Sequence, residues 1–305
     1  MPSYAFFKNQ FVPLAEAKIG IMTHALHYGT AVFEGIRGNW NNNQQQIYLF
    51  RQREHYQRLL NGCQILRMKL PYSLDEMCQM TIELARKCGF KEDIYVRPVA
   101  YKSSEALGVR LHDIEDDFFA FIIPWGRYID VDKARCCVSA WQCPTDNSIP
   151  PQVKIMGHYA GNALAKSDAV EKGFDEAIML SPDGYVAQGS GENIFLVTNG
   201  KLVTPALYNN ILPGITRDSI IKLAKNELGI ETIERPIARA ELYTADECFL
   251  TGTAAHVTPV AEIDHRKIGN GEIGEITKKL QKIYAEVIRG NNAKYLVWCT
   301  PVYKK

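Results

Sequence analysis

Residues 149–165 read IPPQVKIMGHYAGNALA, a segment that places one lysine, Lys154, between two prolines and a run of small residues. The prolines end any preceding element, because proline cannot continue a helix or a central strand. Gly157 and Gly161 introduce a helix that we expect over residues 160–172. Lys154 is therefore expected on a short extended segment in apolar surroundings. Burial there would lower the pKa of the lysine, which is what Schiff-base chemistry requires, although most lysines have no such role.

Hydrophobic periodicity outside this segment predicts strands and helices along the whole 305-residue chain. In the first part we expect strands at residues 4–7, 10–13, 47–50, 94–101 and 118–124, and helices at 54–68 and 74–88. In the second part we expect strands at 136–141, 176–180, 193–197 and 247–251, and further helices at 216–228 and 273–289. The fold class is therefore α/β, of the α+β type, in two domains. A small N-terminal domain would span 1–124, an interdomain loop 125–135 and a larger mixed α/β domain 136–305.

The charge balance and the apolar pattern exclude several classes of protein. Lysine and arginine total 35 against 34 acidic residues, a net charge of +1, so no basic surface for nucleic acid is indicated. The longest apolar run, residues 118–125, has the length of a strand and falls short of the roughly 18 residues that a membrane-spanning helix needs. Residues 1–11 lack the features of a signal peptide. We therefore expect a cytoplasmic protein without nucleic-acid or membrane partners.

The eight cysteines form no C-x-x-C pair and have no histidine at zinc-finger spacing. Most of them lie in apolar segments, where a free cysteine behaves as a small buried hydrophobe. We expect reduced, structural thiols and no metal site.

Three further segments are candidates for binding an anion. Residues 23–37, THALHYGTAVFEGIR, gather histidines, an arginine and aromatics around glycines, although a turn followed by an apolar stretch also explains them. Residues 212–218, LPGITRD, place the N–H groups of Ile215 and Thr216 at a helix N-terminus. Residues 251–255, TGTAA, offer hydroxyls and free amides after a strand. Neither residues 212–218 nor residues 251–255 match a P-loop or a dinucleotide fingerprint.

The guanidinium of Arg58 has two interpretations. Glu54 precedes it by four residues on a predicted helix, which favours a solvated ion pair. The planar fork of arginine also suits phosphate oxygens.

Taken together, these segments resemble the branched-chain amino-acid aminotransferases of the class IV (fold-type IV) group of pyridoxal-phosphate enzymes. The similarity covers nearly the whole chain, with its motifs in order. These motifs are THALHYGTAVFEGIR, REHYQRL, YVRP, the loop LGV at 107–109, PWGRY, the lysine segment, GSGEN, LPGITRD and TGTAAHVTPV.

The resemblance implies pyridoxal 5′-phosphate as the cofactor and a role for each matching residue. Lys154 would be the catalytic residue, binding the cofactor as a Schiff base and moving the proton between the substrate Cα and the cofactor C4′. The other cofactor-binding positions would be Arg58, Ile215, Thr216 and Thr253 for the phosphate, Tyr159 for the phenolic oxygen, Gln188 for the ring nitrogen and Leu212 for one ring face.

The same resemblance implies small-molecule partners, amino acids and 2-oxo acids, and a homodimer as the minimal active unit. Tyr95 and Arg97 would recognise the distal carboxylate of the second substrate, while Tyr28 and Val109 would come from the neighbouring subunit. Assembly beyond the dimer is left open. The substrate-binding positions are Tyr28, Phe33, Arg37, Tyr95, Arg97, Val109, Trp125, Tyr128, Ala254 and Ala255.

The implied reaction exchanges amino groups between leucine, isoleucine or valine and 2-oxoglutarate, giving branched-chain 2-oxo acids and L-glutamate. Sister activities of the same fold are the alternatives: D-amino-acid aminotransferase, (R)-amine aminotransferase and aminodeoxychorismate lyase. The YVRP and HYGTAVFEGIR motifs favour the first reading, although changes in one pocket convert specificity easily.

One position departs from the family pattern. The family places a glutamate opposite the pyridine nitrogen, and the matching residue here is Gln188. A neutral amide cannot stabilise a protonated ring nitrogen by charge, so we expect normal cofactor binding and slow transamination, or a binding protein with little turnover. Glu192 would lie ~13 Å away along an extended strand, unless the turn at 189–191 folds it back.

Overall fold

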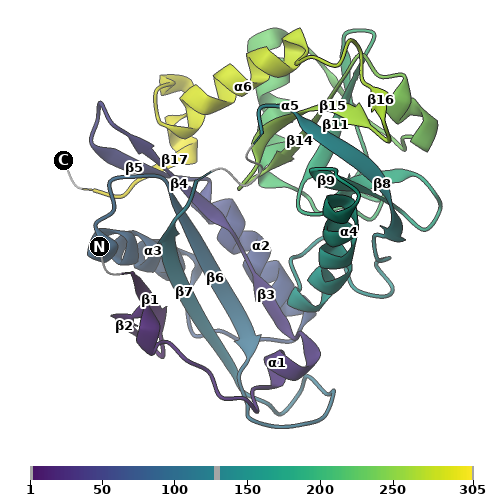
Figure 1. Ribbon diagram of the computed structural model, residues 1–305. Helices are drawn as coiled ribbons and strands as arrows, with labels where there is room; N and C mark the ends of the chain where they lie inside the picture. Colours follow the sequence, from purple (N-terminus) through teal and green to yellow (C-terminus); the bar gives the residue numbers. More distant parts are fainter. Residues whose placement is uncertain (1–2, 127–130, 304–305) are drawn as a thin grey trace. The chain divides into compact units, whose positions relative to one another are not determined.

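The computed structural model describes residues 3–126 and 131–303, which form two compact units (Figure 1). Among these residues, the first unit comprises 3–126, 153–157 and 286–303, and the second comprises 131–152 and 158–285. This division differs from the sequence expectation at two places. Residues 153–157, which include Lys154, and residues 286–303 belong to the first unit rather than to the second.

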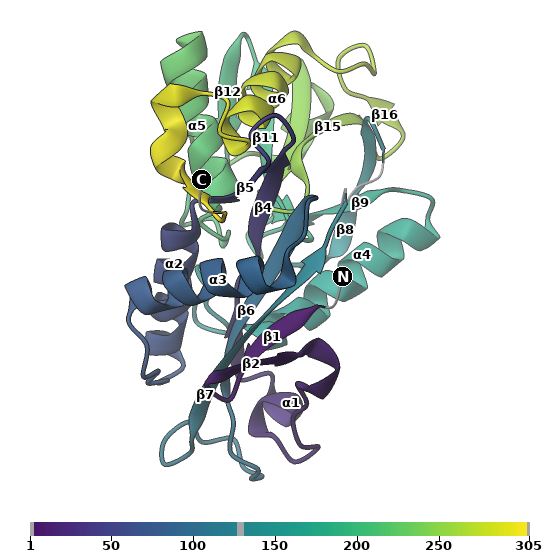
Figure 2. The ribbon, with the colours of Figure 1, turned by 90° about the vertical axis from the view of Figure 1, so that its left-hand side faces the viewer.

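An antiparallel sheet forms the framework of the first unit. Its strand order is β17-β5-β4-β6-β7-β1-β2, and β3 pairs with β6 beside β4. Helices α2 and α3 pack against each other and cover this sheet (Figures 1 and 2). The strands are β1 (Tyr4–Phe7), β2 (Gln10–Pro13), β3 (Ala31–Phe33), β4 (Ile36–Asn41), β5 (Gln46–Phe50), β6 (Ile94–Lys102), β7 (Asp116–Pro124) and β17 (Cys299–Pro301). The helical segments are η1 (Leu14–Glu16), α1 (His24–Tyr28), α2 (Gln52–Ile65), α3 (Leu74–Cys88) and η4 (Ala293–Trp298).

A mixed sheet forms the framework of the second unit. Its order is β10-β9-β8-β15-β14-β11-β12-β13, with β16 paired to β15. β8 is parallel to both of its neighbours, and β12 is parallel to β13. The strands are β8 (Ala134–Gln142), β9 (Glu176–Leu180), β10 (Val186–Gly189), β11 (Asn193–Thr198), β12 (Lys201–Thr204), β13 (Thr232–Glu234), β14 (Glu247–Gly252), β15 (His256–Ile263) and β16 (Arg266–Lys267). The remaining helical segments are η2 (Met156–His158), α4 (Tyr159–Glu171), α5 (Ile215–Leu228), η3 (Arg239–Tyr243) and α6 (Glu275–Ile288).

Local signals explain the elements that the sequence predicts well. Helix α3 has the predicted bounds because Ser73 and Glu76 form a capping box at its start and Gly89 ends it in a left-handed conformation. The β1–β2 hairpin also has the predicted bounds. The polar residues after Asn41 form the turn between β4 and β5. Among the described residues, none of the helices has the length and apolar character needed to cross a membrane.

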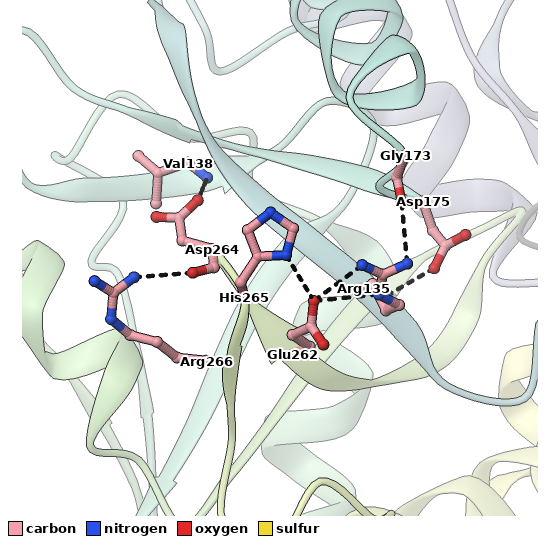
Figure 3. A network of polar contacts seen from close by, with 8 residues as sticks. All are labelled: Arg135, Val138, Gly173, Asp175, Glu262, Asp264, His265 and Arg266. Carbon is pink, nitrogen blue, oxygen red and sulfur yellow. Dashed lines mark hydrogen bonds and ion pairs between the residues drawn. The ribbon is translucent and has the colours of Figure 1, made fainter.

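A polar network connects β8 to the end of β15, where the chain turns into β16 (Figure 3). Oδ1 of Asp264 accepts a 2.9 Å hydrogen bond from the N–H of Val138, and the carboxylate of Glu262 contacts Arg135 and His265. These bonds add to the parallel pairing of β8 with β15. They stabilise the framework of the second unit and lie on its surface, where ion pairs contribute little each.

Candidate active site

The lysine segment runs beside β3 and is fixed by backbone hydrogen bonds. The N–H of Phe33 donates to the carbonyl of Lys154 over 3.0 Å, and the N–H of Gly157 donates to the carbonyl of Gly29 over 3.2 Å. A Cβ on Gly29 would lie 2.6 Å from Cα of Gly157. Gly29 also has a φ of +63°, so the tight approach requires glycine there. The half-buried Lys154 therefore sits on a rigid extended segment, as predicted.

The ring of Phe33 brings two cations of the first unit together. Nζ of Lys154 lies 5.1 Å from the ring centroid and Cζ of Arg97 lies 4.4 Å from it. Nη2 of Arg97 donates a 3.0 Å hydrogen bond to the hydroxyl of Tyr95, whose ring lies 5.4 Å from that of Trp125. An aromatic wall of Phe33, Tyr95 and Trp125 thus carries Arg97 and adjoins the lysine amine.

Arg37 and Gly35 belong to the same wall. Arg37 on β4 is directly opposite Tyr95 on β6, so the two side chains share a face of the sheet. Nη2 of Arg37 contacts Asp93 at 3.4 Å. A Cβ on Gly35 would lie 2.0 Å from the Tyr95 hydroxyl, which explains the glycine in the sequence FEGIR.

Arg58 lies on α2 and does not form the expected pair with Glu54, which instead contacts Arg51 at 2.7 Å. Arg58 forms an ion pair with Glu34, a fully buried residue between β3 and β4. Nε and Nη2 of Arg58 donate to the two carboxylate oxygens of Glu34 over 2.6 and 2.8 Å. Nδ1 of His55 lies 2.7 Å from the same carboxylate.

Electrostatics set the charges of this cluster. Burial alone would raise the pKa of Glu34, but the charge of Arg58 and the hydrogen bonds from Arg58 and His55 outweigh it and hold that pKa well below its ordinary value. For His55 the loss of solvent lowers the pKa and outweighs the effect of Glu34. The cluster therefore contains a carboxylate, a guanidinium and a neutral imidazole. Sequence reasoning missed both Glu34 and His55, because nothing in a single sequence pairs residues of β3 and α2.

Tyr28 and Val109 lie at one exposed end of the first unit. The Tyr28 hydroxyl accepts a 2.9 Å hydrogen bond from the N–H of Gly108, and Nε2 of His24 lies 2.7 Å from the carbonyl of the same glycine. These bonds tie α1 to the loop after β6. Val109 is 79% exposed, and the neighbouring exposed apolar side chains are Ile21, Leu26 and Leu107.

Gln188 and the loop before α5 meet in the second unit. The N–H of Leu212 donates a 2.9 Å hydrogen bond to Oε1 of Gln188, while Nδ2 of Asn193 donates to the Leu212 carbonyl over 2.9 Å. Gly214 is the N-cap of α5, and a Cβ there would lie 1.9 Å from Oδ1 of Asn193. Both the N–H and the carbonyl of Leu212 are therefore hydrogen-bonded, which holds the loop in place at the N-terminus of α5.

The start of α5 and the β14–β15 turn offer donors for an anion. Ile215 and Thr216 open a helix of 14 residues, whose first N–H groups have no acceptor within the helix and lie at its positive end. The partly buried turn at 253–255 carries the Thr253 hydroxyl. It also contains Ala254 and Ala255, the two alanines expected to bind the substrate. Tyr159 is the half-buried first residue of α4. Tyr128 lies outside the described residues.

Glu192 lies closer to Gln188 than an extended chain would place it. The N–H of Gly189 donates to the carbonyl of Glu192 over 2.7 Å, which closes a turn. The Glu192 side chain folds back, so that its Oε2 accepts from the N–H of Gly191 over 3.1 Å. A Cβ on Gly189 would lie 2.8 Å from the same oxygen. The turn at 189–191 therefore brings the carboxylate to the residue next to Gln188.

Comparison with known proteins identifies the family. Residues 31–263 match the family model described as amino-transferase class IV. The chain belongs to the class IV aminotransferases. It is 52% identical to a probable branched-chain-amino-acid aminotransferase of Aquifex aeolicus, over 99% of this chain and 97% of the relative. It is 38% identical to the branched-chain-amino-acid aminotransferase of Escherichia coli K12, over 98% of this chain and 97% of the relative.

Solved structures agree with this assignment. The branched-chain aminotransferase of Thermoproteus uzoniensis with norvaline superposes with a TM-score of 0.95 at 40% identity, covering 99% of this chain and all of that one. The enzyme of Thermobaculum terrenum in its PLP form gives a TM-score of 0.95 at 38% identity, with 99% of both chains covered. The two-unit α/β fold is that of the fold-type IV aminotransferases, as predicted. The chain is therefore an enzyme, an aminotransferase whose cofactor is pyridoxal 5′-phosphate.

The residues present fit this cofactor. Each unit carries donor types that bind a phosphate: a guanidinium in the first, and the N-terminus of α5 and a threonine hydroxyl in the second. A Cβ at position 214 would collide with Asn193, so only glycine lets the backbone of the loop before α5 approach Asn193 this closely. Lys154 supplies the primary amine that the cofactor aldehyde requires.

Proposed function

We propose that the chain transfers amino groups between the branched-chain L-amino acids leucine, isoleucine or valine and 2-oxoglutarate. The products would be branched-chain 2-oxo acids and L-glutamate. The observation that carries this proposal is the arrangement around Phe33, where Lys154 Nζ and Arg97 Cζ lie 5.1 and 4.4 Å from one ring centroid. A reactive amine, an apolar wall and a cation for a carboxylate thus meet on one surface.

The cofactor supplies an electron sink when it is bound, and the residues of the chain bind and orient it. We assign Lys154 to covalent attachment and to moving the proton at the substrate Cα. Arg58, the N–H groups of Ile215 and Thr216, and the Thr253 hydroxyl would bind the phosphate. The assignments at the ring are Tyr159 to the phenolic oxygen, Gln188 to the nitrogen and Leu212 to one face.

The substrate side chain would meet aromatic and small residues. A branched aliphatic side chain gains about 25 cal/mol for each Å² buried against such a surface. The distal carboxylate of 2-oxoglutarate needs a cation instead, and Arg97 beside Tyr95 supplies one. The positions that we assign to the substrate are Phe33, Arg37, Tyr95, Arg97, Trp125, Tyr128, Ala254 and Ala255.

We further propose that two copies of the chain associate through the end of the first unit that carries Tyr28 and Val109. Ile21, Leu26, Leu107 and Val109 are each more than 60% exposed there, on backbone held by the Tyr28–Gly108 hydrogen bond. Exposed apolar patches of this kind mark interaction surfaces. A location in the cytoplasm is supported by the eight buried free thiols, which persist in a reducing compartment.

The visible spectrum of the cofactor-loaded enzyme tests the proposal. L-Leucine should bleach the absorption band of the bound cofactor and 2-oxoglutarate should restore it, while D-alanine should leave it unchanged. Lys154→Ala should abolish the band and the activity, whereas Lys222→Ala, an exposed lysine on α5, should retain both. Bleaching by D-alanine alone would instead assign the chain to the D-amino-acid enzymes. A covalently retained cofactor in Lys154→Ala would refute the role of the lysine.

A further inference from the structure

The buried carboxylate of Glu34 has no part in the chemistry proposed above, yet it forms two hydrogen bonds with Arg58. Glu34 is fully buried, and the Arg58 side chain is 10% exposed. Two hydrogen bonds of 2.6 and 2.8 Å join both carboxylate oxygens to Nε and Nη2 of the guanidinium. A paired contact of this type fixes the plane of the guanidinium as well as its position.

The geometry determines which edge of Arg58 serves a ligand. A guanidinium carries five N–H groups around a rigid plane. Glu34 occupies the edge formed by Nε and Nη2, so the Nη1 edge is directed away from the carboxylate. A single hydrogen bond would let the group rotate about that bond. Two bonds in one plane allow only one orientation.

His55 holds the carboxylate in turn. It lies one helical turn before Arg58 on α2, and its Nδ1 is 2.7 Å from Oε2 of Glu34. Because the buried imidazole is neutral, Nδ1 carries the hydrogen that it donates, and the N–H of Gly35 lies 3.3 Å from the same oxygen. His55 and Gly35 therefore hold the same oxygen, Oε2, that accepts from Nη2 of Arg58.

We propose that Glu34 is a positioning residue that holds the guanidinium of Arg58 in the orientation for the cofactor phosphate, with His55 fixing Glu34. This inference rests on the proposed phosphate role of Arg58. It extends that role to two residues that do not touch the cofactor. Its signature is a loss of affinity that depends on the phosphate group.

Glu34→Asp tests the proposal, because aspartate keeps the negative charge and is one methylene shorter. It cannot reach Nε and Nη2 together, so the orientation of Arg58 is lost while the charge remains. The dissociation constants of pyridoxal phosphate and of pyridoxal, which lacks the phosphate, are measured on the cofactor-free enzyme. We expect the affinity for pyridoxal phosphate to fall about tenfold, as for the loss of one hydrogen bond to a charged group. The affinity for pyridoxal should change little.

Glu176→Asp is the matched control. Glu176 is also fully buried and its Oε2 lies 2.6 Å from Nζ of a lysine, Lys166, in the second unit. It makes no contact with Arg58, so its shortening should leave the ratio of the two affinities unchanged. Equal losses for both ligands in Glu34→Asp, or no loss, would overturn the proposal.

Variants of His55 carry the same test if Glu34→Asp does not fold. His55→Leu removes the donor to Glu34 and should lower the affinity for pyridoxal phosphate selectively. His55→Asn, whose amide can place a donor near the position of Nδ1, should restore it. Identical ratios in both variants would count against the proposal. Arg58→Ala separates this failure from that of the proposed function. If Arg58 binds the phosphate without help from Glu34, Arg58→Ala should lower the preference for the phosphorylated ligand and the variants of Glu34 and His55 should not.

Discussion

The backbone N–H of Leu212 donates a 2.9 Å hydrogen bond to Oε1 of Gln188, and this contact fixes the side-chain amide at a position where the resemblance to the family implies a carboxylate. The Gln188 side chain is buried and also forms a hydrogen bond with the thiol of Cys143. Because the N–H of Leu212 would donate equally well to a carboxylate, replacing Gln188 by glutamate keeps the geometry and changes the charge. The substitution Gln188→Glu therefore tests the effect of charge at this position without a change in side-chain shape.

Gln188→Glu should raise kcat for leucine with 2-oxoglutarate. A carboxylate favours a protonated ring nitrogen, which withdraws electrons more strongly from the reacting carbon. A gain of one pKa unit in this interaction corresponds to about a tenfold effect on rate. The measurement is steady-state kcat for the variant and for Gln79→Glu, which adds the same charge at an exposed position of α3. An unchanged kcat in Gln188→Glu would eliminate this account of the departure, and the folded-back Glu192 would become the group to replace next.

Arg97→Ala should separate the two substrates of the reaction. Arg97 lies over Phe33 and donates to Tyr95, so its removal takes a cation from the aromatic wall and leaves the apolar surface in place. The kcat/KM for 2-oxoglutarate should fall about 10- to 100-fold, the range for losing a charge-assisted hydrogen bond, while that for leucine should change much less. Arg135→Ala, which alters a surface ion pair of the second unit, is the control. Equal losses for both substrates would show that Arg97 does not recognise the distal carboxylate.

Gly214→Ala should weaken cofactor binding through the N-terminus of α5. The new Cβ would lie 1.9 Å from Oδ1 of Asn193, so Asn193 must move and give up its bond to the Leu212 carbonyl. We expect a destabilisation of about 1–3 kcal/mol from overpacking, with weaker retention of pyridoxal phosphate. Gly161→Ala is the matched control, because nothing lies within 4 Å of its Cβ position on α4. Urea unfolding and the cofactor dissociation constant are measured for both variants, and a Gly214→Ala protein that equals the control in both would refute the tight-approach argument.

The sequence predicts those features that local signals determine. The capping box of Ser73 and Glu76 and the left-handed Gly89 lie at the two ends of α3, so the ends of this helix can be predicted from nearby residues alone. β15 was missed because Pro259 argues against a central strand, yet it lies opposite Phe249 in the middle of the sheet. The resemblance supplied the candidate residues, while the partners of Arg58 depend on the packing of β3 against α2. The position of the Glu192 carboxylate likewise follows from a turn that an extended-strand estimate ignores.

The stability of the cofactor-free enzyme should fall in two steps on acidification, since Glu34 and His55 both have lowered pKa values. The pKa of His55 lies below its ordinary value of 6.5, because burial outweighs the attraction of Glu34 and the charges of Arg58 and Lys154 add to the lowering. The unfolded chain therefore binds a proton near pH 6.5 that the folded chain does not, and stability is lost as the pH falls below that value. The carboxyl of Glu34 contributes stability above its ordinary pKa of 4.5, and this contribution is lost as the pH falls further.

Urea unfolding of the cofactor-free enzyme between pH 8 and about pH 2 measures both steps, because the Glu34 step lies below pH 4.5. His55→Asn should flatten the step near pH 6.5, because asparagine does not titrate, and should leave the loss below pH 4.5 in place. His265→Asn, at a histidine that is 71% exposed on the surface of the second unit, should leave both steps as in the wild type. A free energy of unfolding in His55→Asn that follows the wild-type pH dependence through the upper step would mean that His55 is not the buried neutral imidazole beside Glu34.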